Sequence, residues 1–588
     1  MGACFLLTWA AEPSRHAPLH SAVARWLPFV PETERHQDVL EGHLSVWSVY
    51  DEVARGSYFH ADNHGALAFH GWWTEPTGAP VDRSVAAVLQ QQFASGDFQA
   101  VLQQMDGDGT LVYVDPQGAM CAGTDFLGAS HLYWGTRNGL SVVSNRAMVA
   151  AAALHDGQLP TPNAAEYAWL LSGPGAPIGT QTLYRDLHLL GPYETLYRPG
   201  TEVEPSQRVL GPRPWPRPQG DERPSWEDLF GDLTQRAAQI TRLPGVQFDL
   251  TLTGGKDSRA VLAGLVGAQA LGSVRCCYLE SEPNHPDALV TQRLAAHYGL
   301  RLEYRKTVME TLDWQESQAR HNFQVESVFN AYDRKGWQTV DRASTLGGNY
   351  GEIFKSHARL SLVLGPQEAR RFYTRGPWLN RWGLLAPPAR QHLARRMGEW
   401  LDGVLADGTP GLEIHDRWHR ECRMHRWVGQ AMQADGVAIL WMHPLPGRRT
   451  LARYLALPLV DREAHRVHFE LIRRADDWLW RQPFCQQRWS PRLTTVHWRP
   501  GAMVDGPTTS IEPAAAAWRT CGTAVDAYLR DRKDDGLHQI IDRAALDRLL
   551  NRLRHKQSNR DLTSVFGIAG VRQALSGTEP LPLAMAPR

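Results

Sequence analysis

The chain has 588 residues, more than an ordinary single domain, which leaves room for two or more cores. Its 62 lysines and arginines balance its 62 aspartates and glutamates, so no net charge draws the whole molecule to nucleic acid or to an anionic membrane. The seven cysteines are scattered without a CxxC spacing, which favours reduced thiols in a cytoplasmic protein over a disulfide framework. No apolar run reaches the roughly 18 residues that cross a bilayer, so we expect a soluble protein.

The first part of the chain is predicted to be rich in β-hairpins. From residue 3 to about residue 152, short apolar runs alternate with turn signals, such as DPQG at residues 115–118 and RNG at residues 137–139. The acidic run DGDG at residues 106–109 is predicted to be a turn before the strand GTLVYV, because the remaining ligand positions of an EF-hand are absent.

A proline-rich segment is predicted to separate two domains. Residues 206–224 lie in the stretch EPSQRVLGPRPWPRPQGDERP, whose prolines lack amide donors and fix φ, so we expect a linker there. The expected domains then cover residues 1–205 and residues 225–575, and residues 576–588 are expected to be a disordered tail.

Strands and helices alternate after the linker. Ser225 is predicted to cap the first helix, with Asp228 in the capping-box position. Strands are then expected over residues 246–253, 273–279 and 300–305, and helices over residues 257–266 and 286–298. This order predicts a parallel, doubly wound sheet that binds ligands at the carboxyl ends of its strands. Beyond about residue 310 we expect a mostly helical chain.

The sequence TGGKDS follows the first of these strands directly, and a helix begins almost at once. Gly254 and Gly255 let the backbone approach a polyphosphate, and the amides of the helix start favour an anion. Ser258 adds a hydroxyl donor. Asp257 would repel phosphate unless a cation lay between them, so it implies Mg²⁺ on the phosphates. The alternative is an ordinary glycine-rich turn, since the GxxxxGK[ST] pattern of P-loop kinases is absent.

These residues resemble the SGGxDS pyrophosphate loop of the N-type ATP pyrophosphatases, in the superfamily of asparagine synthetases, β-lactam synthetases and lasso-peptide cyclases. Residues 286–288 (PDA) are similar to the PD-A helix of that superfamily, and residues 345–354 (TLGGNYGEIF) resemble its second conserved loop. The stretch DFLGASHLYWGTRNGLSVVSNRAMVAA is similar to its glutaminase-like domain. The resemblance implies an α/β protein with an N-terminal Ntn-type αββα domain and an adenine nucleotide α-hydrolase-like (PP-loop) synthetase domain.

Two departures from the superfamily narrow the expected reaction. Its glutaminases use an N-terminal cysteine, whereas residue 2 is glycine here and the nearest cysteine is Cys4, so we expect no ammonia from glutamine and an inactive glutaminase-like domain. In the second loop Gly351 replaces the first acid of the family. The resemblance therefore favours the branches in which an amine of the substrate itself attacks.

The resemblance also implies roles for single residues of the second loop. Glu352 is expected to join Asp257 in holding Mg²⁺, the alternative being a solvated loop carboxylate. Tyr350 is a candidate for the tyrosine that helps to deprotonate the amine in β-lactam synthetases, with simple packing as the alternative. The other expected nucleotide-binding residues are Leu252, Thr253, Gly254, Gly255, Lys256, Ser258, Leu279 and Gly347.

The superfamily usually places a lysine in a late loop, but none lies between Lys355 and Lys533. Arg481, Arg488 or Arg492 is expected to supply the positive charge instead, because arginine stabilises developing anions; the alternative is a surface cluster. A second pattern consists of His415, His419, Cys422 and His425, where we expect a polar helix without zinc, since interleaved arginines oppose a cation.

By resemblance the best match is a lasso-peptide cyclase. Such an enzyme uses ATP and Mg²⁺ to join the N-terminal amine of a precursor peptide to an Asp or Glu side chain, with release of AMP and pyrophosphate. The implied partners are the precursor peptide, a leader-binding protein and a leader peptidase. A β-lactam-synthetase-like cyclase of small molecules and a non-catalytic peptide-binding relative remain as alternatives.

Overall fold

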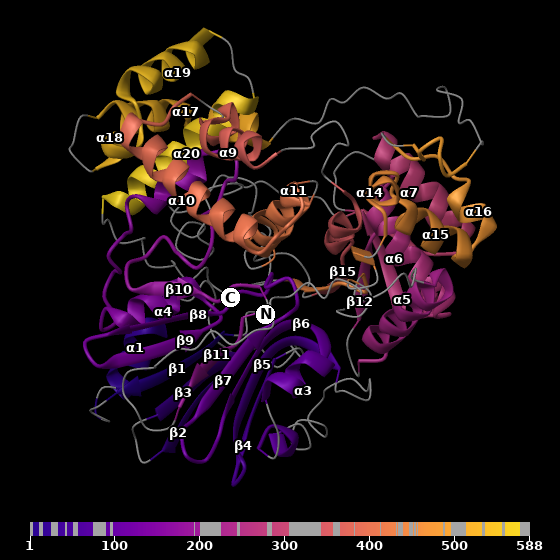
Figure 1. Ribbon diagram of the computed structural model, residues 1–588, viewed down its shortest axis with the longest axis horizontal. Coiled ribbons are helices and arrows are strands. Elements are labelled where there is room, and N and C mark those ends of the chain that lie inside the picture. Colours follow the sequence, from indigo (N-terminus) through magenta and orange to yellow (C-terminus); the bar gives the residue numbers. More distant parts are fainter. Residues whose placement is uncertain are drawn as a thin grey trace.

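A computed structural model gives the structure of much of the chain (Figure 1). It describes residues 4–10, 14, 16–24, 33–40, 44–50, 57–74, 90–94, 98–192, 194–199, 225–243, 247–278, 285–304, 343–356, 365–380, 383–411, 413–430, 432, 439–445, 451, 454–455, 457–485, 488–494, 513–531, 536–555 and 559–576. The expected linker and all but the first residue of the expected tail lie outside these ranges, so the predicted domain boundaries stay predictions.

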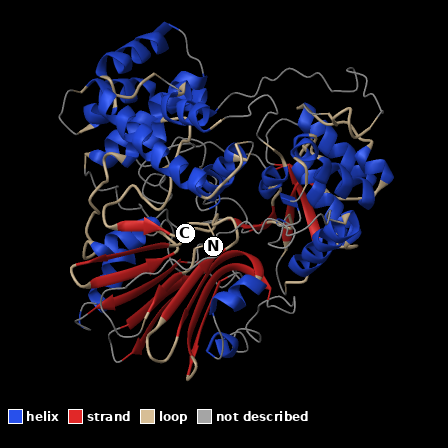
Figure 2. Ribbon diagram, in the orientation of Figure 1, coloured by secondary structure: helices blue, strands red, loops and turns tan. Residues whose placement is uncertain are grey.

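Two antiparallel sheets form the N-terminal part of the chain (Figure 2). The first contains, in spatial order, β10 (Leu187–Leu189), β8 (Tyr133–Arg137), β9 (Leu140–Ser144), β1 (Cys4–Ala10), β3 (Leu44–Tyr50) and β2 (Thr33–Leu40). The second contains β11 (Leu196–Arg198), β7 (Met120–Thr124), β6 (Asp106–Val114), β5 (Gly65–Thr74) and β4 (Ser57–Asp62). The predicted hairpin of β8 and β9 is confirmed, and its turn places Asn138 and Gly139 at positive φ, as a tight hairpin turn requires.

The two sheets pack face to face, and helices cover their outer faces. On β1, Phe5 and Leu7 contact the second sheet, whereas Leu6 points to the other side. The covering helices are α1 (His16–Ala24) and α4 (Ala147–Leu154) on the first sheet and α3 (Phe98–Gln104) on the second. The N-terminal part therefore has the αββα layers that the resemblance implied, and we call it the N-terminal sandwich.

The prediction of a turn at residues 106–109 is wrong. Strand β6 begins at Asp106 and pairs with β5 along its length. The two glycines are needed there because the Trp73 indole lies across them. A Cβ atom at Gly107 or at Gly109 would lie 2.9 Å from a ring atom of Trp73.

A third sheet is entirely parallel. Its strands, in spatial order, are β14 (Leu302–Tyr304), β13 (Val274–Tyr278), β12 (Phe248–Thr251), β15 (Ala343–Leu346) and β16 (Ile439–Met442). The helices that follow or precede them include α5 (Trp226–Thr241), α6 (Lys256–Gly267), α7 (Pro286–His297) and α15 (Arg466–Ala475). From β12 the chain first adds β13 and β14 on one side and then β15 and β16 on the other. The direction of the chain thus reverses between β12 and β15. Parallel sheets bind ligands at such a switch point.

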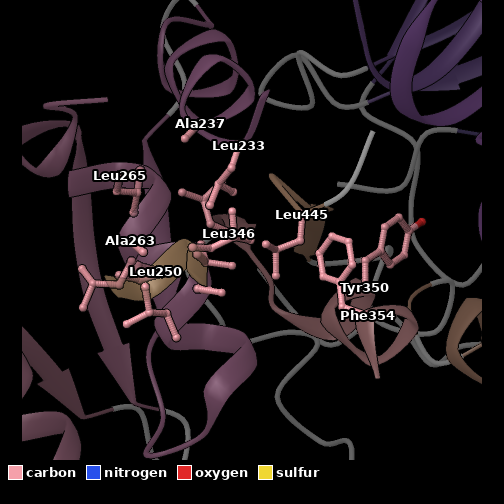
Figure 3. Close-up of a cluster of buried hydrophobic side chains, with 14 of the residues drawn as sticks. Leu233, Ala237, Leu250, Ala263, Leu265, Leu346, Tyr350, Phe354 and Leu445 are labelled. Carbon is pink, nitrogen blue, oxygen red and sulfur yellow. The ribbon is translucent and has the colours of Figure 1, made fainter. Parts of the chain in front are cut away.

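The local predictions for this region are largely confirmed, with one correction. Ser225 accepts a hydrogen bond from the amide of Asp228 and caps α5, as expected. The expectation of a mostly helical chain beyond residue 310 missed β15 and β16, which are four residues each and too short to show a strand period. The core beneath the sheet includes Leu233, Ala237, Leu250, Ala263, Leu265 and Leu346 (Figure 3).

A separate apolar cluster holds the C-terminal helices together. It combines η2 (Glu166–Leu171) with α9 (Pro366–Arg375), α10 (Pro387–Ala406), α17 (Pro513–Arg530), α18 (Leu537–Ile540), α19 (Arg543–His555) and α20 (Asn559–Leu575). In Figure 1 these helices lie apart from the parallel sheet. Between them in the chain run α11 (Ile414–Trp418) and the π-helix His419–Val428.

Among the described helices, none combines the length and the apolar character that crossing a membrane requires.

The N-terminal sandwich and the parallel sheet share a buried interface. Trp72, Phe126 and Leu127 of the sandwich belong to the same apolar cluster as Leu250 and Leu346 of the parallel sheet. The two parts are therefore held together by a continuous core.

A buried carboxylate of the sandwich also forms hydrogen bonds across this interface. Asp108 is 2% exposed and accepts hydrogen bonds from the Trp72 indole (3.0 Å) and from the backbone amide of His443 (2.6 Å). Two residues earlier on β6, Asp106 forms an ion pair with Arg236 of α5. The residues that were expected to form a turn thus anchor the sandwich to the parallel sheet.

We predict that Asp108→Ala destabilises the protein, because each buried donor left without its acceptor costs about 1–3 kcal/mol. Urea unfolding followed by tryptophan fluorescence should show a lower midpoint. Asp402→Ala is the matched control, because that exposed carboxylate of α10 pairs with Arg370 at the surface. Its loss should lower the free energy of unfolding by less than about 1 kcal/mol. Equal midpoints for Asp108→Ala and the unmutated protein would contradict the role given to Asp108.

Candidate functional site

The loop after β12 is closed by hydrogen bonds between its two hydroxyl residues. The Ser258 hydroxyl accepts from the amide of Thr253 (3.1 Å) and donates to the carbonyl of Thr253 (3.2 Å). The Thr253 hydroxyl accepts from the amide of Gly255 (3.3 Å), and Gly255 caps α6. The expected phosphate loop therefore sits at the carboxyl end of β12, at the switch point, and ends on a helix start.

The first glycine of the loop is required by close packing. The Gly254 amide donates to a carboxylate oxygen of Asp287 (2.7 Å), the acid of the PDA motif on α7. A Cβ atom on Gly254 would lie 2.7 Å from that oxygen and 2.9 Å from the Cβ atom of Cys485. The second glycine has more room, since the Thr253 hydroxyl at 3.4 Å is its one near neighbour among the described residues.

Asp257, in the first turn of α6, accepts hydrogen bonds from two side chains. Its Oδ1 atom accepts from Nε2 of His468 (2.7 Å), and its Oδ2 atom accepts from the ammonium of Lys355 (2.6 Å). Burial alone would raise the pKa of Asp257, but the hydrogen bond from His468 and the charge of Lys355 hold it well below its usual range. Asp257 is therefore an ionised carboxylate with both oxygens engaged.

The two residues expected to bind magnesium are brought together, with a lysine between them. Glu352 lies in η5 (Asn349–Phe354), and its Oε1 atom is 2.5 Å from the same ammonium of Lys355. Burial lowers the pKa of Lys355, yet the Asp257 and Glu352 carboxylates outweigh burial and raise it. A magnesium ion bridging these carboxylates would have to displace an ammonium, so the arrangement does not fit a metal at that place.

Lys256 makes its contacts with the protein itself. Its ammonium donates to the carbonyl of Arg488 (2.9 Å), lies 3.1 Å from Nδ1 of His465 and faces the ring of Trp489 at 5.0 Å. Burial, and then the charge of Lys355, lowers the pKa of Lys256 to about 8. His465 has a left-handed backbone (φ 60°), an uncommon conformation outside glycine that often marks a functional site.

The segment expected to carry the late-loop charge wraps around the start of α6. Arg259 is completely buried and donates to the carbonyls of Gln482 (2.8 Å) and Pro483 (2.6 Å). The amide of Cys485 donates to the carbonyl of Gly254 (3.3 Å). We call residues 479–485 and 488–494 the late segment.

The three candidate arginines of the late segment have exposed side chains. The side chain of Arg481 pairs with Asp477 four residues earlier. The backbone of Arg488 reaches the loop through Lys256, as described above. The structure brings this segment to the loop, and the assignment of one arginine to the chemistry stays a prediction.

Tyr350 lies in the interior of the protein. Its ring stacks on His443 with centroids 4.0 Å apart and meets Phe126 of the sandwich edge-on at 6.1 Å. In Figure 3 it lies with Phe354 beside Leu445. Burial, and then the nearby carboxylates of Asp125 and Asp108, raises its pKa well above the usual value. This placement favours the packing alternative over a role in proton transfer.

The positions expected around the adenine are partly described. Leu252 is fully buried, and its carbonyl accepts from the hydroxyl of Thr291 (3.3 Å). Gly347 directly follows β15, and a Cβ atom there would lie 2.7 Å from the Trp441 ring. Leu279 lies outside the described residues. The two described positions flank the switch point from β12 and from β15.

Sequence reasoning missed four residues of this site: Lys355, His465, His468 and Arg259. The signal for Lys355 was its rarity, since lysine is scarce in this chain, together with its position three residues after Glu352. Nothing in the local sequence singled out the histidines, because they reach the loop from a distant part of the chain, His465 from the residue before α15 and His468 from its first turn.

Two other candidate sites have structural roles. Within the described ranges, no cluster of three or more His, Cys, Asp or Glu side chains is arranged for a metal. Nδ1 of His425 lies 2.7 Å from the carbonyl of Gly128 and links the π-helix to the sandwich. Cys4 is buried on β1, and burial raises the pKa of its thiol to about 12, so it is not an activated nucleophile.

No protein-family model and no curated protein sequence matches the chain. Among solved structures, the allosteric regulatory enzyme of purine biosynthesis is similar at 12% identity over 52% of this chain and 80% of the other, with a TM-score of 0.22. A glutamine phosphoribosylpyrophosphate amidotransferase from B. subtilis, complexed with ADP and GMP, is similar at 10% identity over 52% and 81%, with a TM-score of 0.20. At TM-scores this low the likeness supports no conclusion about the fold or the function of this chain.

We predict that Gly351→Ala destabilises the protein, because a Cβ atom there would lie 2.9 Å from Cβ and Cγ of Asp257. Overpacking of this kind costs about 1–3 kcal/mol. Gly403→Ala is the matched control: that glycine lies in α10 with nothing within 4 Å, so alanine should stabilise the helix by about 0.5–1 kcal/mol. The midpoint of thermal unfolding should fall for Gly351→Ala and rise for Gly403→Ala. An unchanged or raised midpoint for Gly351→Ala would refute the close contact.

Proposed function

We propose that this protein is an ATP-dependent, AMP-forming amide ligase of the asparagine synthetase type, and that it closes a precursor peptide into a lasso peptide. The observation that carries the proposal is the glycine-rich loop of residues 253–258 at the switch point of a parallel sheet, which runs directly into α6. A helix start offers amides and a favourable dipole to an anion. The resemblance of this loop to that of the N-type pyrophosphatases supports the pyrophosphate of ATP as the anion.

The chemistry follows from which phosphates the loop holds. The amides at the start of α6 bind the β- and γ-phosphates, and the Ser258 hydroxyl turns from the Thr253 carbonyl to donate to them. This exposes the α-phosphorus to a carboxylate of the peptide. The carboxylate oxygen attacks that phosphorus, and pyrophosphate leaves into the loop. The N-terminal amine of the peptide then attacks the acyl carbon, loses a proton, and displaces AMP. The net result is one amide bond for each AMP and pyrophosphate released.

The ammonium of Lys355 suits the negative charge of the phosphates. Lys355 pairs with Asp257 in the first turn of α6, and a positive group fixed in place stabilises phosphate oxygens without reorganisation. Magnesium is part of the proposal as the ion that accompanies ATP, with phosphate oxygens as its principal ligands. The proposed partners are the precursor peptide, a leader-binding protein and a leader peptidase.

We predict that the purified protein, given ATP and a precursor peptide encoded beside its gene, produces AMP and pyrophosphate in equal amounts to the amide bonds formed. Oxygen-18 placed in the peptide carboxylate should appear in AMP, since that oxygen attacks phosphorus and leaves with it. Mass spectrometry of the nucleotide and the peptide measures both. Release of ADP and phosphate, or AMP that contains no label, would show that the carboxylate is not adenylated.

Loss of the Ser258 hydroxyl should weaken nucleotide binding. Ser258→Ala removes a donor to the phosphates and the contacts that close the loop on Thr253, so we expect ATP to bind about tenfold or more weakly, which corresponds to about 1.4 kcal/mol. Isothermal titration with a non-hydrolysable ATP analogue measures this. Ser273→Ala, an exposed serine just before β13, is the matched control and should bind normally. Equal affinities for both variants would remove Ser258 from the phosphate site.

A further inference from the structure

Lys355 occupies the space between the two acidic residues of the site. Its ammonium lies 2.6 Å from Oδ2 of Asp257 and 2.5 Å from Oε1 of Glu352. The Lys355 side chain is 8% exposed, whereas those of Asp257 and Glu352 are 23% and 37% exposed. The positive charge therefore lies deeper in the protein than the charges that it joins.

The surroundings leave little room for another arrangement. The second oxygen of Asp257 is engaged by His468, and a Cβ atom on Gly351 would press against the carboxyl group. Position 351 thus has no space for a third carboxylate beside Asp257. Two carboxylates this close repel each other unless a cation lies between them. In this chain the protein supplies that cation.

We propose that Lys355 is a built-in replacement for a divalent metal ion, so that the Asp257 and Glu352 pair binds no metal of its own and becomes a metal site when the ammonium is removed. Lysine is a compact point charge with three donors, and it can join two carboxylates while one donor still faces an anionic ligand. A contact between that donor and a polyphosphate rests on the proposed function. The exclusion of metal by the ammonium does not.

The test is a titration of the protein with Mn²⁺ alone, followed by electron paramagnetic resonance of the free ion, with no nucleotide or peptide present. The unmutated chain should show no saturable site that depends on Glu352. Lys355→Met keeps a long, unbranched side chain, one atom shorter than that of lysine, and removes the charge. It should gain one site per chain that binds Mn²⁺ at least about tenfold more tightly than any site of the unmutated chain. Lys355→Arg keeps a cation and should gain none.

Two further variants assign the new site. Lys355→Met combined with Glu352→Gln should lose it again, because one carboxylate is then neutral. The proposal is overturned if folded Lys355→Met, checked by circular dichroism, gains no Mn²⁺ site. It is also overturned if the unmutated protein binds Mn²⁺ in a manner that Glu352→Gln abolishes, and this measurement is decisive even where Lys355→Met fails to fold. Because no ATP is used, the outcome is independent of whether the chain forms amide bonds.

Discussion

The geometry of the site depends on how the carboxylate of Asp257 is shared. One oxygen is bound by His468 of α15 and the other by Lys355, which follows η5. The carboxylate thus joins these two elements to α6, because it accepts a hydrogen bond from each of them. The packing of α6 against α15 and η5 supplies the apolar part of the same junction, with Phe354 and His468 in edge-on contact.

The start of α6 also organises the chain that covers it. Lys256 and Arg259 lie on successive turns, and both donate to backbone carbonyls of the late segment. Unpaired buried carbonyls are costly, so cationic side chains that satisfy them fix an irregular segment in one conformation. A basic residue in a phosphate loop thus need not contact phosphate. Here Lys256 shapes the wall of the site, and its lowered pKa reflects burial in that wall.

Structural features could be predicted from the sequence where they depend on residues that are neighbours in the chain. The cap at Ser225, the hairpin turn at residues 138–139 and the loop at residues 253–258 each rest on residue types within a few positions. Strand β16 gave no such signal, because its four residues become a strand only by pairing with β15, far away in the chain. The rarity of lysine marked Lys355 as unusual but did not reveal its partners. A long side chain selects its partners in three dimensions, and its carboxylate partner on α6 is distant in sequence.

The short helix η5 has two different environments along its six residues. Tyr350 packs against His443 and Phe126 at the interface with the N-terminal sandwich, whereas Glu352 faces the lysine of the site. These two side chains are two residues apart on one short helix, so the position of one constrains the position of the other. Through Phe126 the sandwich therefore supports the short helix that carries Glu352, one of the two acidic residues of the site.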